Sequence, residues 1–569
     1  MISILFIVIL VYVLFTVAKG LTAKAKPWPL WLRIVNYIAI LAIWYYATYP
    51  AINIHSVEFW FFVAIALVLG ILSFCPPTEK QAVVIEKDGS NMVHVHMPKG
   101  KVGPVQLILY IVGGAAVIYF LAAFIFSPII MAGSYAKRIK VTEVPFSEIP
   151  AYQYDQTAII DRSSAELLGD KVMGQMTDLV SQFSVSSEYN QISYKESTSR
   201  VTPLAYDGFI KYLRNRKSGI PGYILVNTTT GNTELVRLDQ KMRYVPSAFF
   251  NENIYRYLRF HYPTVLFGDP TFEIDDQGNP WYVCTTYTYT GIRSMHKVTG
   301  VILFDPVSGN SQKYAVEDAP TWVDRIYPEA LINSELNDYG RYQKGWINSW
   351  LGQEGVTQTS SGYNYLSKNG DIWLYTGMTS AVSDESNIGF MLVNMRTHEA
   401  QFTQTSGATE YAVMQSAEGE VLNYGYTATF PTLINVGGKP VYLLSLKDSA
   451  GLIKMYAMVD AQDYQQVYTT KAEKNTAAAI QELIRTVGGA SAVGPEEAAS
   501  DLEITIDEIR TAVIGGNTFL YFRSGEDLYR LQLSEDNAGK ALFLKEGDKI
   551  TVSFVEEEET KERVIYEID

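Results

Sequence analysis

The chain has few of the residues that most often carry out chemistry. Its 569 residues include two cysteines and six histidines. Cys284 stands alone after residue 136, so it has no partner there for a disulfide. We interpret it as a core residue, since a nucleophilic role would need a base nearby. The sequence contains no His-Glu-x-x-His, no Gly-x-Ser-x-Gly and no phosphate-binding glycine loop. No catalytic residue and no cofactor are therefore predicted.

Basic residues are also in short supply. Lys and Arg total 46 against 60 Asp and Glu, a net charge of −14. Residues 1–136 sum to +4, whereas the remaining residues sum to −18. Because binding to phosphates needs a basic face, this acidic bulk argues against nucleic acid as a partner. With 48% hydrophobic residues, the chain is also too apolar for an intrinsically disordered protein.

The first 136 residues contain long apolar runs that carry almost no charge. The runs are Ile2–Ala18, Ile34–Tyr49, Val57–Phe74 and Val105–Met131. A membrane-spanning helix needs about 20 such residues. The first run is followed by lysines rather than preceded by them, the reverse of a signal peptide. We therefore expect residues 1–136 to form a domain of four transmembrane helices, the first of them retained.

The loops between these runs indicate an orientation. Basic residues follow the first and the third run, and the loop Pro50–Ser56 has none. Such positive loops stay in the cytoplasm. Lys137, Arg138 and Lys140, after the fourth run, oppose this assignment. The balance predicts a multi-pass protein of the cytoplasmic (inner) membrane, with the bilayer as a partner and a large C-terminal part outside the cytoplasm.

Two smaller features lie inside this first domain. Residues 81–97 alternate apolar and polar side chains around Lys87–Ser90, which predicts a cytoplasmic β-hairpin. Gly113 and Gly114 fall in the fourth run. Small residues let helices approach closely, so this pair indicates either packing among the four helices or a contact between subunits.

Residues 137–471 contain an internal repeat. Four apolar strands end in Asn or Asp, and each precedes a polar turn and a second strand. They are Pro221–Asn227, Thr299–Asp305, Ile388–Asn394 and Lys454–Asp460. Their irregular spacing differs from the regular period of a propeller. We expect an extracytoplasmic α+β domain of repeated antiparallel meanders.

One of these units resembles a known family. The strands Pro280–Val283 and Val301–Phe304, followed by Asp305–Gly309, are similar to the paired strands of PepSY-type domains of bacterial membrane proteins. In that family an Asp is followed, a few residues later, by Thr-Gly and an acid. Here Ser308 replaces the Thr and Asn310 replaces the acid. The resemblance implies an extracytoplasmic binding or inhibitory module rather than an enzyme.

The end of the chain has a different composition. Residues 472–500 are rich in Ala, Glu and Gly and are predicted to be a linker that contains one helix. Residues 501–569 contain short strands, which we interpret as a small SH3- or OB-like β-barrel. The acidic stretch Glu556–Glu559 argues against nucleic-acid binding by this barrel.

Three groups of residues are candidate sites. Hard oxygen ligands that could hold calcium, or else form a hairpin turn, are Asp275, Asp276 and Asn279. A basic patch that could face lipid headgroups, or else be a solvated face, consists of Lys211, Arg214, Arg216 and Lys217. A partner-binding surface, or else a loop packed on the repeats, would contain Trp322, Asp324, Arg325, Trp346 and Trp350.

The leading functional hypothesis is a non-enzymatic, membrane-anchored scaffold or partner-binding protein. It would self-associate as a homo-oligomer or bind another envelope protein. One alternative is a subunit of a transport or channel assembly. A second alternative is a hydrolase whose site is assembled from distant residues, with His261 or His296 beside an acid or Cys284.

Overall fold

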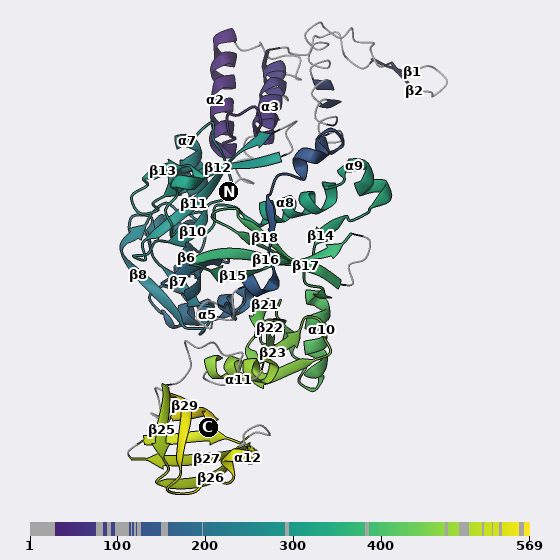
Figure 1. The fold of residues 1–569 in the computed structure, drawn as a ribbon. Coiled ribbons are helices and arrows are strands. Elements are labelled where there is room, and N and C mark those ends of the chain that lie inside the picture. Colours follow the sequence, from purple (N-terminus) through teal and green to yellow (C-terminus); the bar gives the residue numbers. More distant parts are fainter. Residues whose placement is uncertain are drawn as a thin grey trace.

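The computed structural model is rich in β-sheet, and two long helices project from one end of it (Figure 1). It describes residues 29–74, 84–87, 93–96, 113–114, 117–118, 121, 127–149, 157–195, 197–290, 295–381, 386–472, 476–488, 500–514, 517–525, 527–533, 538–556 and 563–568.

The projecting helices are α2 (Leu30–Thr48) and α3 (Val57–Phe74). They pack side by side, with the Tyr37 hydroxyl donating to the carbonyl oxygen of Ala66 at 2.9 Å. The rings of Tyr45 and Phe62 meet edge to face at 5.7 Å. Tyr49, with φ at 35°, ends α2 in the left-handed region and turns the chain toward α3.

The prediction of four transmembrane helices, and with it the multi-pass assignment, is wrong. In the described part of the chain, α2 is the one helix long and apolar enough to cross a membrane. The apolar stretch Val57–Leu67 of α3 is shorter. The run Ile2–Ala18 lies outside the described residues, and Val105–Met131 is described only in part. Helix α3 covers the expected run Val57–Phe74 and α2 covers most of Ile34–Tyr49, so the apolar runs locate helices but do not show which of them can cross a membrane.

The two smaller features of this region can also be located. Strands β1 (Val84–Lys87) and β2 (Val93–His96) pair antiparallel within the segment expected to be a hairpin. Gly113 and Gly114 are helical. A Cβ atom added to either glycine would meet no atom within 4 Å, so no described residue packs closely on them.

Four modules, each a helix accompanied by a sheet, follow along the described chain. The first contains α5 (Arg162–Gln175), β4 (Phe183–Val185), β5 (Asn190–Tyr194), β6 (Ser197–Tyr206), α6 (Phe209–Asn215), β7 (Ile220–Asn227) and β8 (Thr233–Met242). The second contains η4 (Phe250–Glu252), α7 (Ile254–His261), β9 (Leu266–Phe267), β10 (Thr271–Ile274), β11 (Pro280–Thr290), β12 (Met295–Phe304), β13 (Ser311–Tyr314) and η5 (Val316–Asp318). The third contains α8 (Glu329–Tyr342), α9 (Gly345–Ile347), η6 (Asn348–Gly352), β14 (Thr357–Thr359), β15 (Asn364–Lys368), β16 (Asp371–Ser380), β17 (Ser386–Asn394), β18 (Ala400–Thr403) and β19 (Gly407–Ala408). The fourth contains α10 (Glu410–Glu420), η7 (Leu422–Tyr424), β20 (Thr427–Ala428), β21 (Thr432–Val436), β22 (Lys439–Lys447), β23 (Ile453–Asp460), β24 (Val467–Lys471) and α11 (Thr476–Gly488).

The sheets of the four modules share one topology. Their strand orders are β4-β6-β7-β8, β10-β11-β12-β13, β14-β16-β17-β18 and β20-β22-β23-β24, and a further short strand pairs with the second strand of each order. The repeated sequence segments are β7, β12, β17 and β23, which occupy the same place in each sheet. In the third module, the short strand β3 (Val141–Glu143) from earlier in the chain adds parallel to β18.

The Asn or Asp at the end of each repeated strand closes the turn that follows. The Asn227 side-chain oxygen accepts the backbone N–H groups of Thr229 and Thr230 at 3.0 and 2.8 Å. The same kind of contact is made by Asp305, Asn394 and Asp460. Asn and Asp are favoured in turns because their short side chains form this bond.

The modules share hydrophobic cores in pairs. One core joins the first and second modules, where the rings of Tyr223 and Phe272 lie 5.7 Å apart. Another joins the third and fourth, with Phe390 and Tyr442 at 6.0 Å. Helix α11 buries Ile480 against strands of the fourth module. The segment expected to be a linker therefore contributes a helix to this module.

The last part of the chain forms a six-stranded sheet, not the predicted closed barrel. Its elements are β25 (Ser500–Thr505), β26 (Glu508–Ile514), β27 (Asn517–Ser524), β28 (Asp527–Gln532), α12 (Ala538–Ala541), β29 (Lys549–Glu556) and β30 (Arg563–Ile568). Strands β25 and β26 are the two edges, and they do not pair with each other within the described residues. Closure depends on which edges meet, which short strand patterns in a sequence do not show. Figure 1 places this sheet at the end remote from α2.

Truncation of a shared core should destabilise the whole repeat domain. Leu444 is 2% exposed in the core of the third and fourth modules, whereas Leu422 is 77% exposed. Leu444→Ala removes packed methyl groups, so we expect the free energy of unfolding to fall by about 2–5 kcal/mol. Leu422→Ala, the matched control, should change it by about 0.5 kcal/mol or less. Denaturant titration of the full chain in detergent measures both, and equal effects would contradict the shared core.

Candidate functional site

Two carboxyl groups are buried where the first, second and third modules meet. Glu273 on β10 and Asp324 in the connection to α8 are 0% and 2% exposed. The Asp324 backbone N–H donates to Glu273 Oε2 at 3.0 Å. The Ser193 backbone N–H, on β5, donates to Asp324 Oδ2 at 2.7 Å. These bonds tie the first module, the second module and the connection together; we call this group the carboxyl junction.

The residue after Asp324 extends the junction to the third module. Arg325 donates to Thr271 Oγ1 at 3.0 Å and forms an ion pair with Glu329, the first residue of α8. The Tyr365 hydroxyl on β15 donates to Glu329 Oε1 at 2.7 Å. The guanidinium of Arg200, on β6, lies 5.9 Å from the centre of the Tyr365 ring. Charged and polar groups thus connect three modules in the interior.

Burial changes the protonation of the two acids. It raises the pKa of Glu273 to about 7, although the Asp324 N–H and the charge of Arg325 oppose the rise. Burial also raises the pKa of Asp324 well above its usual value, and repulsion from Glu273 adds to the effect. Shifted acids of this kind occur in active sites, but they also occur in structural networks. Here the bonds of both acids go to backbone N–H groups of neighbouring elements.

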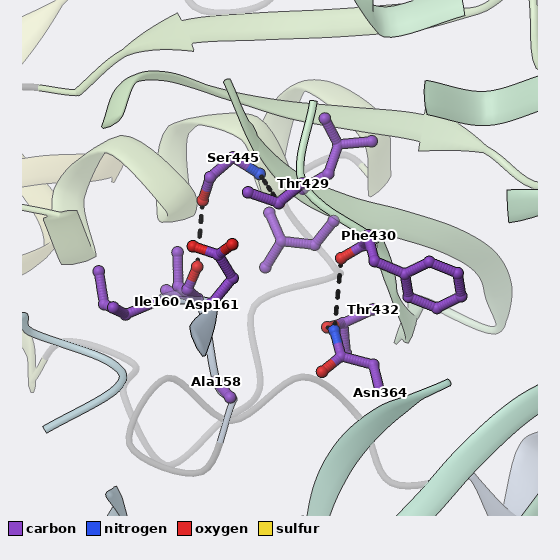
Figure 2. Close-up of a pocket in the computed structure, with 11 residues that line it drawn as sticks. Ala158, Ile160, Asp161, Asn364, Thr429, Phe430, Thr432 and Ser445 are labelled. Carbon is purple, nitrogen blue, oxygen red and sulfur yellow. Dashed lines mark hydrogen bonds between the residues drawn. The ribbon is translucent and has the colours of Figure 1, made fainter. Parts of the chain in front are cut away.

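A pocket lies close to this region, between residues 158–161 and the fourth module (Figure 2). Ser445 Oγ donates to the Ile159 carbonyl oxygen at 3.1 Å, and its N–H donates to Thr429 Oγ1 at 3.0 Å. Across the pocket, Asn364 Nδ2 donates to Thr432 Oγ1 at 2.8 Å. Its enclosed space is about 10 Å³. That is room for about one water molecule, whereas ligand pockets usually span about 300–1,000 Å³.

The residues considered for a hydrolase are elsewhere. Cys284 is buried in the core of the first and second modules, and burial raises the pKa of its thiol. His261 stacks on Tyr257 at 4.2 Å, and His296 lies 4.6 Å from Tyr289. None of the three lines the pocket of Figure 2.

The candidate calcium ligands form a turn. Asp275 Oδ1 accepts the backbone N–H groups of Gln277 and Asn279 at 3.0 and 2.8 Å. Its Oδ2 accepts from the Asn279 side chain and from Trp281 Nε1. Asp276 is exposed beside them. Four donors thus occupy the Asp275 carboxylate, and the described residues contain no group of three acids, histidines or cysteines placed to hold a metal.

The residues of the aromatic candidate surface lie in two separate places. Trp322 packs on Trp281 with ring centres 5.7 Å apart, and Asp324 and Arg325 belong to the carboxyl junction. Trp346 and Trp350 lie in the helical segment after α8, with their rings stacked 6.0 Å apart. Trp350 is 66% exposed.

The basic candidate patch lies on α6 and the turn after it. Lys211 pairs with Asp207, and Arg216 lies 3.9 Å from the buried Glu252. Arg214 and Lys217 are exposed. The same helix exposes apolar side chains, Ile210 at 66% and Leu213 at 42%. The patch is therefore amphipathic, with cationic and apolar groups on one exposed element.

An arginine that sequence reasoning did not single out joins α2 to the second module. Arg256 on α7 is 5% exposed, and its Nε donates to the Tyr46 carbonyl oxygen at 3.1 Å. Its guanidinium lies 4.6 Å from the centre of the Tyr46 ring and 5.2 Å from that of Tyr49. The turn after α2 adds backbone contact, since the Ile52 N–H donates to the Pro263 carbonyl oxygen at 2.7 Å. A helix pattern can mark Arg256 as a face residue, but it cannot show what that face meets.

A second arginine, Arg138, joins helical residues 127–135 to the third module. Its guanidinium lies 3.5 Å from Glu335 and also pairs with Asp338, both on α8. The Arg138 side chain is 7% exposed. This charge opposed the orientation inferred from the sequence, and the structure shows that it serves an internal contact.

Comparison with known proteins adds little to this picture. No protein-family model matches the chain, and no curated protein matches it. A solved endo-arabinase from Bacteroides thetaiotaomicron is similar over 63% of this chain and 95% of its own, with 8% identity and a TM-score of 0.17. At that score the likeness carries no argument about fold or activity.

The carboxyl junction should make stability depend on pH. A raised pKa means that folded Glu273 holds its proton at pH values where the unfolded chain has released it. Its contribution is therefore complete below about pH 4.5 and is lost as pH rises through about 7. Glu273→Gln stays neutral, so we expect the variant to gain stability relative to the natural chain between about pH 5 and pH 8.

Denaturant unfolding of the full chain at several pH values measures this difference. Glu317→Gln, which alters an exposed glutamate, is the matched control and should give a smaller change with pH. A difference for Glu273→Gln that stays constant across the range would contradict the protonated junction.

Proposed function

We propose that the chain is a non-enzymatic, membrane-attached scaffold. Helix α2 would anchor it, the four-module domain would lie outside the cytoplasm, and the C-terminal sheet beyond that domain would bind a protein partner. The observation that carries this proposal is the contact of Arg256 with the last turn of α2. An anchor on a free linker would need no such contact, whereas a scaffold gains a defined orientation from it.

Further contacts support a fixed orientation of the domain on α2. Asn53 Nδ2 donates to the Thr264 carbonyl oxygen at 2.9 Å, and the Tyr46 hydroxyl donates to Asn251 Oδ1 at 2.7 Å. The ring of Phe260 lies 5.8 Å from that of Tyr45. Together with Arg256, these groups connect the end of α2 to several points of the second module.

The amphipathic patch on α6 supports a position next to lipid. Phe250 precedes Asn251, which bonds Tyr46 of α2, and the Phe250 ring lies 6.1 Å from Phe209 at the start of α6. The patch is thus continuous with the contact at the end of α2. Apolar side chains with Lys and Arg beside them suit the headgroup layer of an anionic membrane.

A surface for a partner is available at the opposite end. Leu542 and Phe543, after α12 of the C-terminal sheet, are 62% and 78% exposed. Contiguous exposed apolar side chains often mark protein-interaction sites. In Figure 1 this sheet is remote from α2, so a bound protein would be held away from the membrane. Neither the transport alternative nor the hydrolase alternative has a specific observation in its favour among the described residues.

Loss of the Arg256 contact should loosen the domain on its anchor. Spin labels on cysteines at Ile38 in α2 and Asp239 in β8 report the distance between them, in a Cys75→Ser chain in nanodiscs. We expect a narrow distance distribution in the unsubstituted chain. Arg256→Ala should broaden it, because the hydrogen bond and the ring contact of Arg256 with Tyr46 are lost. Arg237→Ala, which removes an exposed ion pair, should leave it narrow. A broad distribution before any substitution would contradict the fixed orientation.

Partner binding is tested at the remote end of the chain. A photo-reactive residue at Phe543 should form a discrete crosslink in intact membranes, whereas one at the exposed Arg510 should not. A product of twice the chain mass would identify a second copy as the partner. If Phe543 forms no crosslink and light scattering shows a monomer, the scaffold proposal fails.

A further inference from the structure

A short helical segment after α8 presents an apolar face to the outside. Helix α9 (Gly345–Ile347) continues directly into η6 (Asn348–Gly352). Ile347, Trp350 and Leu351 are 68%, 66% and 68% exposed. Their spacing of three and four residues places them on one side of a helix. We call these three residues the Trp350 face.

The inner side of the segment is fastened to helical residues 127–135 and the turn after them. Trp346 packs on a cluster that includes Ala132, Tyr135 and Tyr342. Trp350 stacks on Trp346, with the ring planes 20° apart. The Trp350 face therefore lies next to the end of this helical stretch, and Figure 1 shows α9 beside it.

The same cluster is connected through strands β12 and β11 to the turn after α2. Met295, at the start of β12, belongs to the cluster that Trp346 contacts. In the paired strand β11, Tyr289 lies 6.1 Å from the ring of His55, which follows α2. The hairpin of β11 and β12 thus connects the Trp350 face to the turn after α2. The face is on the same end of the domain as the anchor.

The shape of the segment is stabilised by its own polar groups. Asn348 Nδ2 donates to the Glu354 carbonyl oxygen at 3.0 Å, and its Oδ1 accepts the Glu354 N–H at 3.2 Å. Lys344 and Glu354 pair at 2.7 Å with both side chains exposed. The face is therefore preformed, with charged groups beside it.

We infer that the Trp350 face inserts into the interfacial layer of the bilayer that holds α2. Three large apolar side chains are unfavourable in water, and burying their surface in lipid is favourable by the hydrophobic effect. Tryptophan is enriched at membrane–water boundaries, where its ring is apolar and its N–H reaches polar groups. This occupant follows from continuity with the end of α2. The inference rests on the proposed anchoring by α2.

Exposure alone does not distinguish this face from others, so a matched position is needed. Leu422, in η7 of the fourth module, is 77% exposed. The fourth module lies away from α2 in Figure 1. A lipid contact should therefore occur at Leu351 but not at Leu422, although both are exposed leucines.

The test uses a polarity-sensitive fluorophore on a single introduced cysteine in the full chain, reconstituted in nanodiscs. Cys75→Ser removes one native thiol, and Cys284 is buried. The labelled variants are Leu351→Cys, Leu422→Cys and Ile43→Cys, the last within α2. Lipids with a nitroxide near the headgroup or deep in the acyl chain then report contact and depth.

We expect the label at 351 to emit at shorter wavelength and to lose most of its emission with the shallow nitroxide. The label at 422 should keep its emission with both lipids, and the label at 43 should be quenched. Quenching at 43 without quenching at 351 overturns the inference but leaves the anchor standing. Absence of quenching at both positions overturns the anchor as well. A shift at 351 that depends on protein concentration, without quenching, would mean that a second copy covers the face.

Discussion

The structure depends on one packing constraint: the helix of a single module is too small to cover both faces of that module's sheet. Helix α5 has 14 residues, and the sheet beside it has five strands. A face left open would expose rows of apolar side chains, so each module shares a core with its neighbour. Tyr223 against Phe272 and Phe390 against Tyr442 are the large side chains at these shared cores. Folding of one module is therefore coupled to folding of the next.

Shared cores hold the modules together in pairs, and polar contacts set how the modules are oriented relative to one another. The carboxyl junction provides such contacts, because Glu273 and Asp324 accept hydrogen bonds from N–H groups of separate elements. Burial of such groups is unfavourable unless their bonding is satisfied, and buried charges add little net stability. Their value here is geometric, since each hydrogen bond holds its donor and acceptor within about 2.7–3.2 Å of each other. The raised pKa of Glu273 is the consequence of placing it there.

The molecule has two ends with different surroundings. At one end Arg256 and Arg138 connect the modules to the helical segments that precede them in the chain. At the other end the C-terminal sheet exposes Leu542 and Phe543. The interior between them is packed, with a water-sized space at the pocket of Figure 2. The proposed scaffold function rests on this arrangement of the two ends.

Local sequence patterns were sufficient for the features that depend on neighbouring residues. The repeated strands that end in Asn227, Asp305, Asn394 and Asp460 were visible because an Asx turn uses only residues next to each other. The helix Thr476–Gly488 was visible by its composition, but its burial on the fourth module was not. The predictions of four transmembrane helices and of a barrel at the end of the chain are wrong. Which apolar helix crosses a membrane and which strand edges meet both depend on what lies beside each element. The partners of Arg256, Arg138, Glu273 and Asp324 lie far away along the chain or on other elements, so only the tertiary structure could bring them together.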